Sequence, residues 1–348
     1  MLFNSDITLA SQLCISHHLP FAVVALPCRD DVEFYADEAT VPMDVDESEE
    51  DVFFLNSYGN PWEFPLGIAK RFLASEIIDR YGNCQCPVRN CALHVMTDST
   101  IKVNYIRGLQ ELIKTLKTHG GKTVISRVIC GKTHKSWTTV AQQYFSAFPD
   151  TFRALYYTPL TGGWLVASPE LLLAATDGNI ETMSLAGTRK CSEGIHAWDQ
   201  KNVEEHDYVT RFIVDCFRSS GIMSEVGDAE SVKFGNIEHL CHRIKGVYTG
   251  KLLPLIHALS PTPALAGEPR ERAVADIARI EEHDRKCYGG YIGIKKNDTV
   301  TVYANLRCLN FDGENYCIYA GGGITRDSVP EKEWEETENK SRYLRSLL

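Results

Sequence analysis

The C-terminal segment of this sequence, residues 300–340, constrains the fold more than any other stretch. Two runs of alternating apolar residues, 300–309 and 316–320, predict a pair of strands, and a helix that starts with a proline follows them. The glycines at 321–323 let the backbone approach a small ligand closely, and Arg307 offers a planar fork of donors that suits an anion. The segment therefore predicts either a small-anion site or a plain hairpin followed by a helix.

Glu336 and Lys340 are four residues apart in this predicted C-terminal helix, so they share one helical face. They could face a ligand together. Charged pairs at this spacing are common and individually weak on protein surfaces. A simple surface ion pair therefore remains an open interpretation.

The composition excludes several classes of function. Hydrophobic residues make up 44% of the chain and charged residues 24%, which is typical of a soluble globular protein with a sizeable core. A formal net charge of −10, with no basic cluster, argues against binding to nucleic acid or to an acidic membrane surface. No run approaches the roughly 18 apolar residues of a membrane span, and the first ten residues do not resemble a signal peptide. We therefore expect a cytoplasmic protein.

The 12 cysteines are dispersed along the chain, and several lie inside apolar runs, so we expect most of them to be reduced core residues. Those inside apolar runs include Cys130, Cys216, Cys308 and Cys317. A second group could supply four soft ligands to zinc, but its spacing matches no common structural zinc site, and ordinary loop and core cysteines are the favoured interpretation. This group contains Cys84, Cys86, Cys91 and His94.

Periodicity in the rest of the chain predicts a mixture of helices and strands. Helical spacing covers 101–119, 139–147, 202–217, 252–259 and 271–282. Strand-like runs cover 21–26, 122–130, 152–157, 163–167, 233–240, 243–248 and 288–294. The acidic run at 44–51 is expected to be a solvated loop. No repeat or low-complexity linker is present, so no division into two domains is visible.

Two glutamates have local sequences that suggest chemistry. Glu170 lies between a proline and three leucines, where burial would raise its pKa toward that of a useful proton donor. Glu205 continues the apolar stripe of a predicted helix, where a carboxylate is costly unless it is paired or binds a metal. The alternatives are a turn glutamate that faces solvent at 170 and an acid favoured by the helix dipole at 205.

Eight short motifs together resemble, in order and approximate spacing, those of the chorismate-utilising enzyme family. They are 122–127 (KTVISR), 167–170 (ASPE), 185–189 (LAGTR), 204–206 (EEH), 236–240 (NIEHL), 261–264 (PTPA), 319–324 (YAGGGI) and 333–340 (EWEETENK). They span about 118–345, whereas 1–110 matches nothing specific and is divergent. Within the family the motifs are most similar to those of the isochorismate synthases.

The resemblance implies an α+β fold, in which residues 1–348 form a single chorismate-binding domain. Two stacked, mainly antiparallel sheets would be flanked by helices, with the site between a sheet edge and the helices. It also implies a reaction in which water attacks C2 of chorismate while the C4 hydroxyl departs, an isomerisation to isochorismate that would feed menaquinone or siderophore biosynthesis. The only partner that it implies is this small-molecule substrate, and we expect a monomer.

The resemblance further assigns roles to individual residues. Lys122 would be the general base that activates water, and Glu170 the general acid toward the leaving hydroxyl. Glu205 and Glu336 would bind Mg²⁺, which orients the substrate and neutralises its charge. The substrate itself would be bound by Gly187, Thr188, His239, Arg307, Tyr319, Gly322 and Lys340. On its local sequence alone, His239 could equally be a core histidine.

Two positions separate activities within the family. Lys122 suits water as the nucleophile, whereas the ammonia-using anthranilate synthases typically have glutamine there. Ala186 stands where aminodeoxychorismate synthases often have lysine. Salicylate synthases share the lysine, so elimination of pyruvate from isochorismate remains an alternative, as does a non-catalytic relative. Ser184, Ser260 and the short loop at 190–201 depart from the usual pattern, and we expect them to change loop packing more than chemistry.

Overall fold

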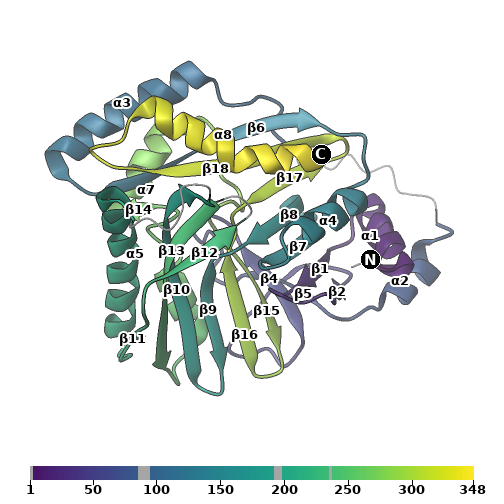
Figure 1. Cartoon of the computed structure of the whole chain (residues 1–348). Coiled ribbons are helices and arrows are strands. Elements are labelled where there is room, and N and C mark those ends of the chain that lie inside the picture. The colour runs from purple at the N-terminus through teal and green to yellow at the C-terminus, as the bar shows by residue number, and fades with distance from the viewer. Residues whose placement is uncertain (1–2, 85–94, 192–197, 235–236) are drawn as a thin grey trace.

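Two antiparallel sheets stacked face to face form the centre of the molecule, and helices cover their outer faces (Figure 1). The computed structural model describes residues 3–84, 95–191, 198–234 and 237–348. The arrangement confirms the expected α+β fold of two stacked antiparallel sheets.

The first sheet, sheet A, carries the glycine-rich segment and the strand that begins at Lys122. Its strands run in the order β14 (Gly267–Glu268), β6 (Lys122–Lys132), β18 (Asn315–Ile324), β17 (Cys308–Asp312), β8 (Gly162–Ser168), β7 (Phe152–Thr158), β1 (Phe21–Ala25) and β2 (Glu33–Ala36). The long pair β6 and β18 is in register from Thr123 opposite Ile324 to Lys132 opposite Asn315. This pairing places the glycines at 321–323 beside the start of β6.

The second sheet, sheet B, is also antiparallel throughout. Its strands run in the order β11 (Glu225–Val226), β13 (Ile237–Val247), β10 (Asn179–Lys190), β9 (Leu171–Thr176), β16 (Thr299–Ala304), β15 (Tyr291–Lys296), β4 (Val52–Asn56), β5 (Leu66–Ala69) and β3 (Val41–Pro42), and β12 (Glu230–Phe234) also pairs with β13. The runs at 233–240 and 243–248 were expected to be separate strands, but β13 is continuous across 241–242. That prediction is wrong because Cys241 is buried in the core and residues 241–242 continue the pairing with β10, opposite Leu185 and Ser184.

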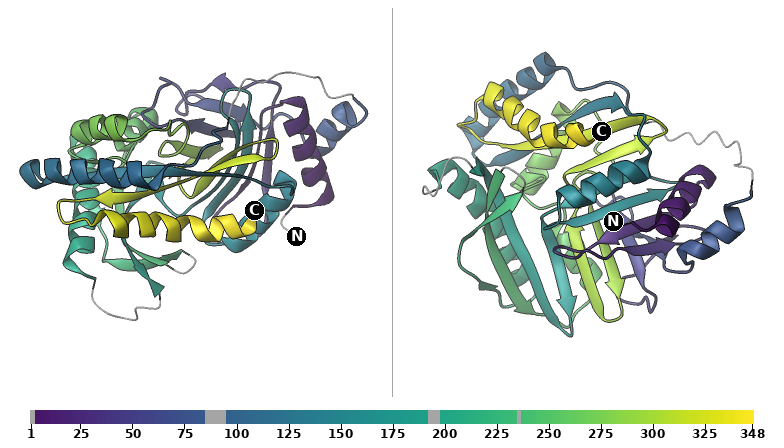
Figure 2. Two further views of the ribbon diagram at one scale, coloured as in Figure 1. Left: turned by 90° about the horizontal axis from the view of Figure 1, so that it is seen from above. Right: turned by 45° about the vertical axis from the view of Figure 1, so that its right-hand side comes forward.

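The helices lie on the outer faces and at one end of the stacked sheets (Figures 1 and 2). They are α1 (Ser5–His17), α2 (Ala74–Tyr81), α3 (Lys102–His119), α4 (Trp137–Ala147), α5 (Gln200–Ser219), α6 (Leu252–Leu259), α7 (Arg270–Ile280) and α8 (Pro330–Leu347). The helices predicted from periodicity are confirmed to within a few residues. Pro330 starts α8, where a missing N–H costs no hydrogen bond. Within the described residues, no helix is long and apolar enough to span a membrane.

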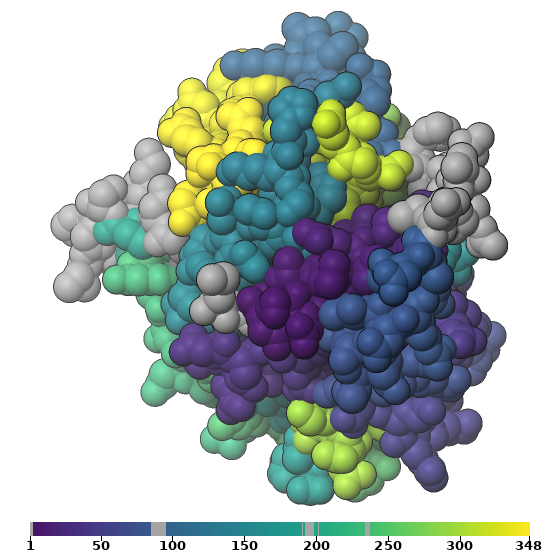
Figure 3. Space-filling model, turned by 90° about the vertical axis from the view of Figure 1, so that its right-hand side faces the viewer, coloured from purple at the N-terminus to yellow at the C-terminus, as the bar shows by residue number. Residues whose placement is uncertain are grey.

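Separate apolar clusters fix these layers. Aromatic and aliphatic side chains from both sheets, including Phe53, Tyr156 and Trp164, fill the space between the sheets. A second cluster packs α1 and α4 against sheet A, and a third packs α5 and α6 against sheet B. The N-terminal 110 residues contribute strands to both sheets, and Figure 3 shows them (purple and blue) lying against the teal segment on one face.

The apolar run at 300–309 does not form one strand. It crosses from sheet B to sheet A, because β16 ends at Ala304 and β17 begins at Cys308. Arg307 lies at the crossing with a φ of 50°, a conformation that is uncommon for residues other than glycine. The hydroxyl of Tyr144 in α4 donates to the Arg307 carbonyl oxygen, which fixes the backbone there. The expected pairing with the next run is confirmed for β17 and β18, where Leu309 lies opposite Ile318.

The structure corrects the prediction for two of the cysteines. Cys130 and Cys317 lie directly opposite each other on β6 and β18 and form a disulfide, so the expectation that both are reduced is wrong. Cys216 and Cys308 are free thiols.

In the acidic run at 44–51, the Asp46 carboxylate accepts from the backbone N–H groups of Leu252 (2.6 Å) and Leu253 (3.1 Å), so it caps α6. Of the four residues considered for zinc, Cys84 is exposed and the other three lie outside the described residues.

Candidate active site

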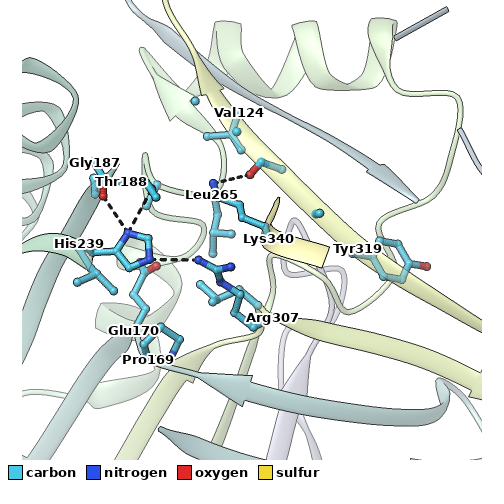
Figure 4. A pocket seen from close by; sticks show the side chains of 18 of the residues that line it. Val124, Pro169, Glu170, Gly187, Thr188, His239, Leu265, Arg307, Tyr319 and Lys340 are labelled. Carbon is cyan, nitrogen blue, oxygen red and sulfur yellow. Dashed lines mark hydrogen bonds between the residues drawn. The ribbon is translucent and has the colours of Figure 1, made fainter. Parts of the chain in front are cut away.

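Most of the expected site residues line one pocket, which lies between β10 and β13 on one side and β18 and α8 on the other (Figure 4). The expected residues that line it are Glu170, Gly187, Thr188, Glu205, His239, Arg307, Tyr319, Gly322 and Lys340. Lys122 and Glu336 are connected to the pocket by ion pairs with two of these lining residues. Lys122 pairs with Glu205, and Glu336 pairs with Lys340. Residues from distant parts of the sequence therefore meet at one place.

Lys122 is the first residue of β6, and its side chain is only 1% exposed. Its Nζ lies 2.8 Å from Oε1 of Glu205, which α5 presents from the opposite side. Gly323 of β18 makes room for this pair, because a Cβ there would lie 2.5 Å from Cε of Lys122 and would also clash with the Glu205 carboxylate. A glycine at 323 is therefore required by the ion pair.

Glu170 lies in the turn between β8 and β9, and it is buried rather than directed toward solvent. Burial raises the pKa of its carboxyl to about 7. A hydrogen bond from Oγ1 of Thr262 (3.0 Å) and the positive charge of Lys122 oppose this shift. A carboxyl with a pKa near neutrality is well suited to donate a proton at physiological pH.

His239 connects the turn at Gly187 to Arg307, which is expected to bind the anionic substrate. Its Nδ1 lies 2.8 Å from the carbonyl oxygen of Gly187, so this nitrogen must carry the hydrogen. Nε2 is then free to accept from Nη2 of Arg307, 3.1 Å away (Figure 4). Burial and the positive charge of Arg307 lower the pKa of His239 to about 3. His239 is thus neutral at physiological pH, and it orients the Arg307 guanidinium.

The turn at Gly187 and Thr188 interrupts the pairing of β10 with β13. Gly187 has a φ of 73°, which glycine adopts easily. The side-chain oxygen of Asn202, in the first turn of α5, accepts from the Thr188 N–H at 2.9 Å. This bond fixes the turn relative to the helix that carries Glu205.

Two carboxylates of α8 lie close to Gly322 of β18. Oε1 of Glu336 lies 2.7 Å from Nζ of Lys340, which also donates to the carbonyl oxygen of Gly321 at 2.8 Å. A Cβ at Gly322 would lie 3.4 Å from Oε2 of Glu333 and 3.7 Å from Oε1 of Glu336. Glu333 is buried here, and no feature of its local sequence distinguished it from neighbouring acids.

The carboxylates of Glu205 and Glu336 suit a hard divalent cation such as Mg²⁺. This ion prefers oxygen ligands and commonly takes one or two carboxylates together with water or substrate. Across the described part of the chain, no three acidic, histidine or cysteine side chains already converge as a ready-made metal site. Glu205 and Glu336, the expected ligands, are each paired with a lysine, Lys122 and Lys340 respectively.

Tyr319 lines the pocket, and its side chain is also part of the core between the sheets. The ring stacks between Trp164 (5.6 Å between centroids) and Tyr288 (5.5 Å) in the core between the sheets. Its hydroxyl points away from Arg307 and His239 (Figure 4). The structure therefore places Tyr319 at the site but does not bring its hydroxyl to the anion-binding groups.

Some lining residues were not foreseen from the sequence. Val124, Leu265 and Tyr288 line the pocket, and Thr262 holds Glu170 from behind. The turn at 261–264 was recognised only as a motif. Nothing in a single sequence shows that its threonine reaches a glutamate 92 positions earlier.

Comparison with known proteins identifies the family of the chain. The family model described as chorismate binding enzyme matches residues 94–348, and the chain therefore belongs to this family. The chain is 33% identical to anthranilate synthase component 1 of Aquifex aeolicus over 200 residues. This match covers 52% of the chain and 40% of that protein. It is 32% identical over 195 residues to the isochorismate synthase MenF of Escherichia coli, covering 53% and 45%. The chain thus spans less than half the length of each of these relatives.

The solved structure of MenF, the menaquinone-specific isochorismate synthase from Escherichia coli, has a closely similar fold. It superposes with a TM-score of 0.81 at 21% identity, covering 100% of this chain and 92% of that one. The likeness establishes the shared fold. The activity of the present chain has to be argued from its own residues.

Proposed function

We propose that this chain is a Mg²⁺-dependent isochorismate synthase, an isomerase that moves the hydroxyl of chorismate from C4 to C2. One observation carries the proposal. A buried lysine, Lys122, and a buried glutamic acid, Glu170, lie at the same pocket as the cationic side chains of Arg307 and Lys340. A base to activate water and an acid to protonate the departing hydroxyl are the two groups that this exchange requires.

The substrate carries two carboxylates, and the pocket offers two kinds of partner for them. Arg307 presents a guanidinium that His239 orients, and Lys340 reaches in from α8 (Figure 4). A cation bound by Glu205 and Glu336 would neutralise the remaining negative charge. Lys122 is paired with Glu205, which lines the pocket, so the base would lie beside the bound substrate.

In the proposed reaction Lys122 acts as the neutral amine: once the proton of its ion pair with Glu205 has passed to solvent, it removes a proton from water as the water oxygen attacks C2. Glu170 gives its proton to the C4 hydroxyl, which leaves as water. The pKa of about 7 keeps a large fraction of Glu170 protonated at neutral pH, as a general acid requires. Lysine at 122, in place of the glutamine typical of anthranilate synthases, favours water over ammonia as the nucleophile.

The test is to incubate the purified chain with chorismate and Mg²⁺, with and without ammonium, and to separate the products by chromatography. The proposal predicts isochorismate in both cases. Salicylate with pyruvate would instead assign the chain to the salicylate synthases, anthranilate would assign it to the ammonia-using enzymes, and unchanged chorismate would contradict an enzymatic role.

Replacing Glu336 with glutamine is expected to weaken Mg²⁺ binding by at least about tenfold, because the amide lacks the charge of a direct ligand. Binding is measured by calorimetric titration of the chain with Mg²⁺, beside the Mg²⁺ dependence of turnover. Glu335→Gln is the matched control, since that neighbour is exposed on the same helix. An unchanged titration for Glu336→Gln would remove this residue from the cation site.

A further inference from the structure

A second buried ion pair lies directly behind the pocket, outside the groups assigned above. Arg285 donates from Nε to Oε2 of Glu281 (2.8 Å) and from Nη2 to Oε1 (2.6 Å), and both side chains are 2% exposed. The guanidinium also stacks over the ring of Tyr58 at 4.6 Å. Such a paired, forked and stacked arginine fixes its neighbours in one geometry.

The pair takes the place of a neighbouring strand along the open edge of β6. Strand β14 pairs with β6 only at Lys122 and Thr123. Beyond it, the Val124 carbonyl accepts from Nη2 of Arg285 at 2.8 Å, and the Ser126 N–H donates to Oε1 of Glu281 at 2.6 Å. The two side chains thus continue the hydrogen bonding of the strand that begins with Lys122.

The same arginine fixes the turn that supports Glu170. Nη1 of Arg285 donates to the Leu265 carbonyl at 2.7 Å. The Leu265 N–H in turn bonds to the carbonyl of Thr262 at 2.9 Å, and the Thr262 hydroxyl donates to Glu170. Val124 and Leu265 both line the pocket, whereas Arg285 itself is not among its lining residues (Figure 4).

We propose that Glu281 and Arg285 form a positioning pair that fixes the strand of Lys122 and the turn behind Glu170 relative to each other across the pocket. The inference rests on the proposed function, since it takes Lys122 as the base and Glu170 as the acid. A single guanidinium reaches both segments, so loss of its fork displaces one group relative to the other.

Arg285→Lys tests this directly, because lysine retains the charge and much of the volume but cannot bond two carbonyls and a carboxylate in one plane. We expect kcat for chorismate to fall by about 100-fold, as misplacement by about 1 Å can cause, with a much smaller change in KM. Glu281→Gln should lower kcat as well, and the double variant should lose little more than Arg285→Lys alone, because both act as one unit.

The matched control is Arg153→Lys. Arg153 is also buried, and it bonds the carbonyls of Phe145 (3.0 Å), Leu26 (2.7 Å) and Arg29 (2.9 Å), none of which lines the pocket. It should lower thermal stability while leaving kcat of the folded enzyme unchanged. A general structural role for Arg285 predicts the same behaviour for both variants, and that result would overturn the proposal.

Hydrogen exchange followed by mass spectrometry tests the pair without relying on activity. Arg285→Lys should reduce protection in peptides from both 122–128 and 262–268, whereas Arg153→Lys should leave both unchanged. Loss of protection in only one segment, or in neither, would contradict the coupling. If the wild-type chain leaves chorismate unchanged, the proposed function fails, and the exchange result still decides whether the pair joins the two segments.

Discussion

Replacing Lys122 with alanine is expected to lower turnover of chorismate by roughly a hundred- to ten-thousand-fold, the range typical for loss of a general base. The side chain is buried at the start of β6, and its amine lies 2.8 Å from Glu205 beside the pocket. Its removal leaves the β6–β18 pairing intact, because the backbone bonds of the strand do not involve it. Steady-state kinetics and thermal unfolding should therefore show an inactive but folded protein.

The matched control is Lys132→Ala, at the exposed far end of the same strand. It should retain wild-type kinetics. If Lys122→Ala kept activity within a few-fold of the wild type, Lys122 would not be the base and the nucleophile would have to be activated by another group.

Glu170→Gln is expected to abolish turnover and, above neutral pH, to stabilise the fold. The folded pKa of about 7 lies above the ordinary value of 4.5 for a glutamic acid, so the folded state binds this proton more tightly than the unfolded state does. The contribution of the neutral Glu170 carboxyl to the free energy of unfolding is therefore fully present below about pH 4.5. It is lost as the pH rises through 7. Above that pH the ionised, buried carboxylate costs about 3 kcal/mol, a cost that glutamine avoids.

Urea denaturation at pH 5 and pH 8 measures this effect. Glu170→Gln should exceed the unfolding free energy of the wild type by less than about 1 kcal/mol at pH 5 and by about 3 kcal/mol at pH 8. Glu335→Gln, on the exposed face of α8, should show no such pH-dependent gain. Equal differences from the wild type at both pH values would show that Glu170 does not carry a raised pKa in the folded protein.

Local patterns in the sequence predicted most of the elements but not how they are connected in space. The spacing of apolar residues located α3, α6 and β1 closely, because each buries one face or is buried throughout. The same patterns described 300–309 as one strand. The crossing between sheets at Arg307 depends on a backbone reversal that apolar alternation does not encode.

The site divides in the same way between local and long-range information. Glu170 could be selected from the sequence because a proline and three leucines surround it, which predicts burial. The hydrogen bond from Thr262 and the bridge from Arg285 to Val124 and Leu265 join segments far apart in the chain. Only the folded structure brings these residues together, so a single sequence could not reveal them.

The most direct test of the proposed reaction is to let the enzyme turn over chorismate in water enriched in heavy oxygen, with Mg²⁺ present, and to analyse the product by mass spectrometry. Attack of water at C2 with loss of the C4 hydroxyl predicts isochorismate that carries one heavy oxygen atom, at C2. Isochorismate that forms without the label would contradict water as the nucleophile, and with it the roles of Lys122 and Glu170.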